Sequence, residues 1–72
     1  MEAYVLIEAH PEQTKQVYAS LQAIRGLEEC HEVTGPYDIV AKVKVTSLRD
    51  MSKNIRAIVG VLRTTTLVAF PE

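Results

Sequence analysis

The chain has 72 residues and is 47% hydrophobic, which is the length of one small domain and the composition of a folded protein. Eight Lys and Arg residues against nine Asp and Glu residues give a formal charge of −1, which argues against nucleic-acid binding, because that needs clustered basic residues. Cys30 is the only cysteine, which excludes an intrachain disulfide and a zinc site of paired cysteines. Because so small a core is marginal alone, we expect self-association.

Neither a membrane span nor a targeting segment is visible. The longest apolar run, which includes residues 4–7, is far too short to cross a bilayer. The N-terminus lacks the basic stretch followed by a long apolar one that marks a signal peptide. We therefore expect a cytoplasmic protein without a membrane partner.

The first half of the chain predicts a strand, a helix and a second strand. Residues 3–9 alternate between two faces as a strand does. One face carries Ala3, Val5, Ile7 and Ala9, and the other carries Tyr4, Leu6 and Glu8. Pro11 suits the first position of a helix, and Gly26 suits the position just after its end. The helix stripe consists of Thr14, Val17, Leu21 and Ile24, and residues 27–33 read as the next strand.

The second half repeats this order after a central hairpin. Residues 34–38 form the turn, and residues 39–45 are rich in β-branched side chains, as a strand is. Ser47 and Asp50 fit a capping box that opens a helix ended by Gly60. Its stripe consists of Leu48, Met51, Ile55 and either Ile58 or Val59. A last strand over residues 61–70 stops at Pro71.

A shift of 34 residues overlays the chain on itself, which predicts the fold. Val5 then falls on Ile39, and the glycine after the first helix falls on the glycine after the second. Two such β-α-β units usually interleave. We therefore predict one domain over residues 1–72 of the α+β class, a ferredoxin-like βαββαβ plait. It has a four-stranded antiparallel sheet with two helices on one face.

The sheet face without helices is too apolar to be left in water. A second copy stacked on it, sheet to sheet, would cover it. The expected dimer interface consists of Tyr4, Leu6, Val40, Leu62, Val68 and Phe70. Cys30 and Thr34 join this face if no bulge interrupts their strand. In an alternative assignment the two faces of the last strand are exchanged, because Val61, Leu67 and Ala69 also alternate.

Few residues suggest chemistry, so we predict no enzyme, no cofactor and no metal. His10 and His31 are far apart, and the glycines form no phosphate-binding pattern. Two features remain, which are Asp38 at the hairpin tip and the hydroxyls of residues 64–66. Each has a structural explanation as well. Asp38 can simply close an Asx-turn, and threonine is a good strand former.

Two motifs resemble a known family. Residues 34–40, Thr-Gly-Pro-Tyr-Asp-Ile-Val, resemble the T-G-x-Y-D-hydrophobic signature of the effector-binding (RAM) domain of Lrp/AsnC transcription regulators. Residues 60–66, Gly-Val-Leu-Arg-Thr-Thr-Thr, are similar to its G-V-x-R-T-x-T strand. The resemblance covers roughly the whole chain. These 72 residues leave no room for the family's helix-turn-helix, so the chain resembles the stand-alone form. A smaller departure is Pro36, which stands where the family often has a polar or acidic residue and which has no backbone N–H.

The resemblance implies sheet-to-sheet dimers that gather into rings, often octamers, with amino acids bound between dimers beside the turn. The ligand-binding residues it implies are Thr34, Gly35, Pro36, Tyr37, Asp38, Thr64, Thr65 and Thr66. The Asp38 carboxylate would suit the ligand's ammonium group, and backbone N–H groups and hydroxyls its carboxylate. The hypothesis is a stand-alone amino-acid-sensing domain that acts through its assembly. The alternative is an interaction module that forms mixed oligomers with full-length regulators and has no ligand of its own.

Overall fold

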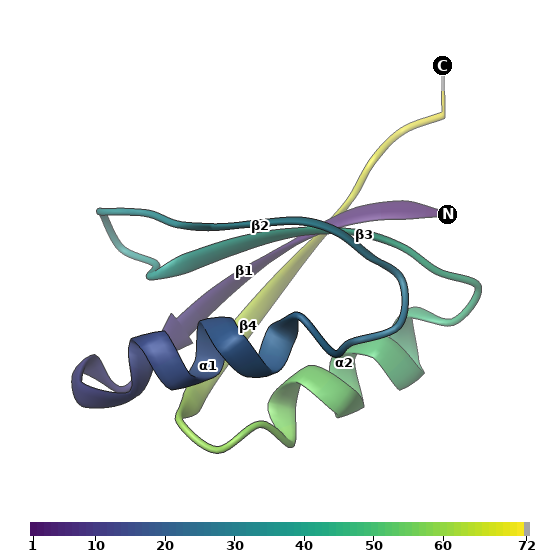
Figure 1. Ribbon diagram of the computed structural model, residues 1–72. Helices are drawn as coiled ribbons and strands as arrows, with labels where there is room; N and C mark the ends of the chain where they lie inside the picture. Colours follow the sequence, from purple (N-terminus) through teal and green to yellow (C-terminus); the bar gives the residue numbers. More distant parts are fainter. Residues whose placement is uncertain (72) are drawn as a thin grey trace.

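A computed structural model describes residues 1–71 and has one sheet and one helical layer (Figure 1). The element order is β1 (Glu2–Ala9), a 3₁₀ turn η1 (Pro11–Gln13), α1 (Thr14–Leu21), β2 (Leu27–Glu32), β3 (Ile39–Lys44), α2 (Leu48–Arg56) and β4 (Val61–Val68). The antiparallel strands lie in the order β2-β3-β1-β4, and both helices cover the same face. The predicted ferredoxin-like fold is therefore confirmed.

The core lies between the central strands and the helices. Alternate residues of β1 and β3 point into it, as the period of two requires. Its buried side chains are Ala3, Val5, Ile7, Ala9, Val17, Leu21, Cys30, Ile39, Ala41, Val43, Met51 and Ile55. Each large one contributes about 1.5–3 kcal/mol by leaving water. This core joins β1 to β3, which carry the candidate site at one end.

Both helices are shorter than the apolar stripes predicted for them. α1 ends at Leu21, so Ile24 lies beyond the helix, although it still packs against the core. The Ser47 hydroxyl accepts a 3.2 Å hydrogen bond from the Asp50 N–H, which is the predicted cap of α2. Ile58 packs on the core while Val59 is 75% exposed, which decides between them. Within residues 1–71, no helix is long and apolar enough to cross a membrane.

Each edge strand contains an irregularity near its start. Leu27 pairs with Val43 but Glu29 pairs with Lys42, so Glu28 is an extra residue in β2. In the same way Leu62 is extra in β4, because Ala9 pairs with Val61 while Glu8 pairs with Arg63. The two extra residues are 34 positions apart, which is the spacing of the internal repeat.

The bulge in β2 decides the condition set for Cys30, and the bulge in β4 corrects the prediction for Val68. Cys30 pairs with Ala41 and is 8% exposed, so it belongs to the core side, and Thr34 lies beyond the end of β2. Val68 pairs with buried Ala3, so its assignment to the open face is wrong. The physical reason is that one alternating phase cannot continue through a bulge.

The alternative assignment of the last strand is correct for Leu67 but not for Val61, which pairs with Ala9 and packs on the core. Thr65 and Leu67 pair with Leu6 and Tyr4 on the open face, whereas Thr64 and Thr66 pair with core residues. Leu62 opposes no residue of β1, and Phe70 lies beyond the end of the strand at Val68. Their membership of a dimer interface stays a prediction.

Two glycines with positive φ allow a matched test of the packing. A Cβ on Gly26 would lie 2.8 Å from the Lys44 carbonyl oxygen, whereas a Cβ on Gly35 would have nothing within 4 Å. We expect Gly35→Ala to lower the free energy of unfolding by about 1–2 kcal/mol through backbone strain alone. Gly26→Ala adds a clash and should cost about 2–5 kcal/mol in all. Urea unfolding at one fixed protein concentration measures both, and equal losses would contradict the packing described.

Candidate functional site

The loop between β2 and β3, residues 33–38, is attached to the end of β1 by Asp38. The Asp38 N–H donates to the Ile7 carbonyl oxygen at 2.9 Å, and its own carbonyl oxygen accepts from the Val33 N–H at 2.9 Å. The Asp38 Oδ2 accepts a 2.8 Å hydrogen bond from the Ala9 N–H. Its carboxylate therefore joins the loop to β1, 29 residues away in the sequence, rather than only closing a local turn.

The tip of this loop is exposed. Thr34, Gly35 and Pro36 all lie in water, and Gly35 has a φ of 135°, which favours a residue without a side chain. The space around the Gly35 Cα is open to 4 Å. A small ligand or a second subunit can therefore approach the backbone here closely.

The structure brings the two sequence motifs together through one contact. The Tyr37 hydroxyl lies 3.3 Å from the Thr65 hydroxyl, so the loop motif touches the threonine run of β4. Both side chains are half-buried. Thr64 and Thr66 are on the other side of the sheet, so Thr65 is the threonine that meets the loop. For Thr64 and Thr66, strand propensity is a sufficient explanation.

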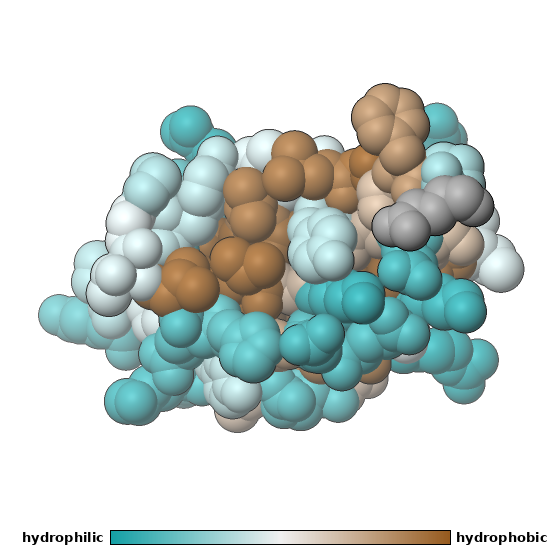
Figure 2. All heavy atoms as spheres, turned by 90° about the horizontal axis from the view of Figure 1, so that it is seen from above, coloured by the Kyte–Doolittle hydropathy of each residue, from teal (hydrophilic) through white to brown (hydrophobic). Residues whose placement is uncertain are grey.

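The open face of the sheet carries an apolar band with charged margins. Figure 2 shows this band running over the face, with hydrophilic side chains along one side. The band includes Tyr4, Leu6, Val40 and Leu67, and the last is 51% exposed. Glu2 lies 3.9 Å from Lys42, and Glu8 lies 3.9 Å from Arg63. Sequence reasoning missed Leu67 as a preferred interface residue because the bulge at Leu62 is not visible in the pattern.

The exposed area of the chain is large for its mass. It amounts to 5010 Å², whereas a folded monomer of 8.0 kDa exposes roughly 4,500 Å². The excess of roughly 500 Å² approaches the area of about 800 Å² that one partner buries in a standard interface. Exposed apolar side chains on the open face and beyond β4, such as Leu67 and Phe70, contribute to this excess.

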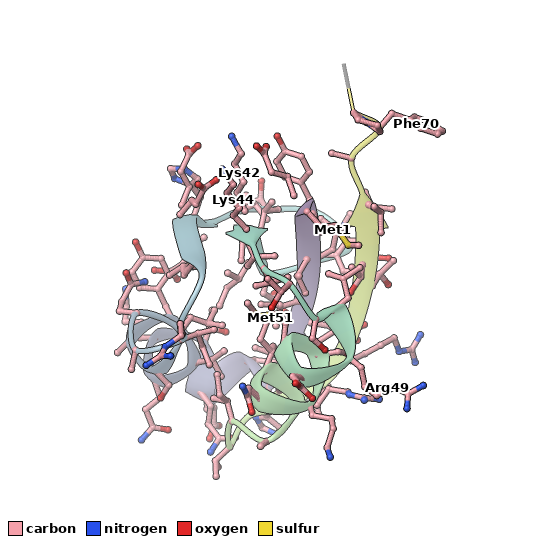
Figure 3. All side chains as sticks on the ribbon, turned by 90° about the vertical axis from the view of Figure 1, so that its right-hand side faces the viewer. Met1, Lys42, Lys44, Arg49, Met51 and Phe70 are labelled. Carbon is pink, nitrogen blue, oxygen red and sulfur yellow. The ribbon has the colours of Figure 1, made fainter. Side chains whose placement is uncertain are left out.

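Two cavities lie at the end of the sheet away from the loop. One of 430 Å³ lies beside the start of α2, and its lining includes Arg25, Lys44 and Asp50. The other, of 820 Å³, lies between Tyr4, Lys42 and Phe70. Figure 3 shows Lys42 and Lys44 on the open side of the sheet, with Phe70 pointing away from it. Neither cavity was predicted, because the lining residues come from several elements and the chain ends and share no motif.

The titratable side chains of residues 1–71 show one clear metal-related result and one shifted thiol. These residues contain no group of three His, Cys, Asp or Glu side chains that could hold a metal ion. Cys30 behaves as the predicted small buried residue. Burial raises the pKa of the Cys30 thiol, and the Glu32 carboxylate acts in the same direction, while a hydrogen bond with Gln22 opposes them. The thiol is therefore protonated and unreactive at neutral pH.

Comparison with known proteins identifies the family. Residues 2–72 match the Lrp/AsnC ligand binding domain, and the chain belongs to this family. It is 35% identical to an uncharacterized HTH-type transcriptional regulator of Pyrococcus furiosus, with 94% of this chain and 50% of the relative covered. It is 31% identical to the HTH-type transcriptional regulator LysM of Sulfurisphaera tokodaii, with 92% and 50% covered. The chain spans about half the length of these curated relatives.

Solved structures agree with this assignment. The protein TTHA0845 from Thermus thermophilus is 31% identical, with a TM-score of 0.88 and coverage of 99% of this chain and 94% of that protein. The feast or famine regulatory protein Rv3291c from M. tuberculosis, solved in complex with L-methionine, is also 31% identical. Its TM-score is 0.76, with coverage of 96% of this chain and 50% of that protein. The chain is thus similar over nearly its full length to a protein that binds an amino acid.

Substitutions of Asp38 test its role in holding the loop. Asp38→Ala leaves the buried Ala9 N–H without its acceptor, and should lower the free energy of unfolding by about 1.5–3 kcal/mol. Asp38→Asn keeps an oxygen acceptor and loses only the charge, so about 1 kcal/mol is expected. Thermal or urea unfolding compares the two variants. If Asp38→Ala were as stable as the native chain, the contact with Ala9 would have no structural role.

Proposed function

We propose that this chain is an amino-acid-binding regulatory domain that pairs sheet to sheet and assembles further, up to an octamer, with its effector at the contact between dimers. The observation that carries this is the family match over residues 2–72, together with the Asp38-held loop whose tip is exposed. Rv3291c, solved with L-methionine, supports an amino acid as the ligand. The named relatives are transcriptional regulators, which supports a regulatory rather than an enzymatic role.

The loop has the groups that an amino acid needs. A carboxylate offers two oxygens with about four lone-pair sites, so Asp38 can accept from the Ala9 N–H and from a ligand ammonium together. The exposed backbone at Gly35 and the Thr34 hydroxyl suit the ligand carboxylate. Pro36 has no N–H to offer, so recognition relies on the residues beside it.

The proposed assembly uses two surfaces, which are the open face of the sheet and the tip of the loop. The apolar band of the open face supplies the dimer contact, and its charged margins set the register between copies. The loop tip lies at an end of the sheet, so a second dimer can reach it when the band is covered. A ligand that binds only where two dimers meet stabilises the assembly, by about 2.7 kcal/mol at a hundredfold excess over its Kd. Binding and assembly are then one regulatory event.

Two apolar-to-lysine substitutions separate the dimer face from other exposed positions. Leu67→Lys puts a charge in the apolar band and should shift the protein toward the monomer, raising the dimer dissociation constant at least about tenfold. Val59→Lys is the control, because Val59 is 75% exposed in the turn before β4. Sedimentation velocity over a range of concentrations measures both. Equal masses for the two variants would contradict dimerisation through this face.

Titration with the twenty amino acids tests effector binding. We expect heat for at least one of them in isothermal titration, and a change of mass when it is bound. Asp38→Asn keeps the loop acceptor but removes the charge, so the affinity should fall about ten- to a hundredfold while the fold is retained. Silence of the native chain toward all twenty, with an unchanged mass, would contradict an effector role.

A second function has its own observation. The curated regulators are about twice as long as this chain and share its domain at 31–35% identity. A domain this similar can stack its open face on that of a longer relative and form mixed oligomers without a ligand. Recovery of a helix-turn-helix regulator with the chain, both with and without amino acids, would favour this alternative.

A further inference from the structure

The Tyr37 side chain crosses a strand to reach its partner. The loop leads directly into β3, Thr65 is in β4, and β1 lies between these two strands. Because Thr65 pairs with Leu6 on the open face, the phenol spans β1 on that face. A loop residue thus occupies part of the surface that we assign to the dimer contact.

Tyr37 also lies between the fixed and the exposed parts of the loop. On one side Asp38 is held to β1 through its N–H and its carboxylate. On the other side Gly35 and Pro36 are exposed. Because the Tyr37 side chain joins the loop tip to the open face, a displacement of the tip also moves the phenol on that face.

We propose that the hydrogen bond between Tyr37 and Thr65 is a positioning contact that couples the effector loop to the dimer face. The inference rests on the proposed function, since it needs an effector at the tip and a second copy on the sheet. When the phenol lies over β1 and bonds Thr65, its ring belongs to the surface that the second copy covers. An effector that holds the tip in this position favours dimerisation, and by linkage dimerisation favours the effector to the same extent.

The neighbouring threonines provide a matched control. Thr66 is adjacent in the chain but pairs with Val5 on the helix side, away from Tyr37. Thr65→Val and Thr66→Val make the same chemical change, which replaces a hydroxyl by a methyl group of similar size. Tyr37→Phe removes the other hydroxyl of the contact and keeps the ring in place.

The test is a double-mutant cycle on the dimer dissociation constant, measured by sedimentation velocity without ligand. Tyr37→Phe and Thr65→Val should each raise the constant about two- to tenfold, as expected for one hydrogen bond. The double variant should be no weaker than either single one, because the two hydroxyls act as a pair. Thr66→Val should match the native chain. Additive losses, or an equal effect of Thr66→Val, would overturn the proposal.

A second measurement uses the amino acid that gives the largest heat with the native chain. Its effect on the dimer dissociation constant should shrink in Tyr37→Phe and Thr65→Val by the same factor in both, and persist in Thr66→Val. An undiminished effect in both variants overturns the coupling but leaves the effector role intact. If no amino acid binds, the effector role fails and the cycle without ligand judges the contact alone. A chain that is monomeric at every concentration overturns both.

Discussion

The attachment of the loop to β1 by Asp38 is the constraint on which the candidate site depends. Its N–H, its carbonyl oxygen and its carboxylate each make one hydrogen bond, at 2.9, 2.9 and 2.8 Å. The bond to the carboxylate is charge-assisted, and such bonds are stronger than bonds between neutral groups; it also satisfies the N–H of Ala9, which is only 3% exposed. Without the carboxylate contact, the loop tip, the Tyr37 phenol and the start of β3 would no longer be held in fixed positions relative to β1.

The architecture was predictable because two independent patterns agreed. The internal repeat predicted two β-α-β units, and the alternation along β1 and β3 identified their buried faces correctly. The cap of α2 by Ser47 was likewise visible as a local motif. These features depend on residues close in sequence or on a strict period, and single sequences preserve such information.

The faces of β4 and the contact between the two motifs depended on strand register, which a sequence does not display. The apolar residues of β4 occur on both of its faces, so hydrophobicity could not choose between them, and one extra residue at Leu62 changed the phase. For the same reason the pairing of Tyr37 with Thr65 was invisible, because the two residues are 28 positions apart. Both motifs were recognised, but only the register shows which hydroxyl of the second motif meets the first.

The paired irregularities of β2 and β4 have a consequence for how the molecule can grow. Both are outer strands, and an outer strand with a bulge is a poor template for hydrogen bonding to another chain. Fibril-like addition of strand to strand is thereby discouraged on both flanks. The two extra residues occupy equivalent places in the internal repeat, so each outer strand is interrupted at the same point of its half of the chain.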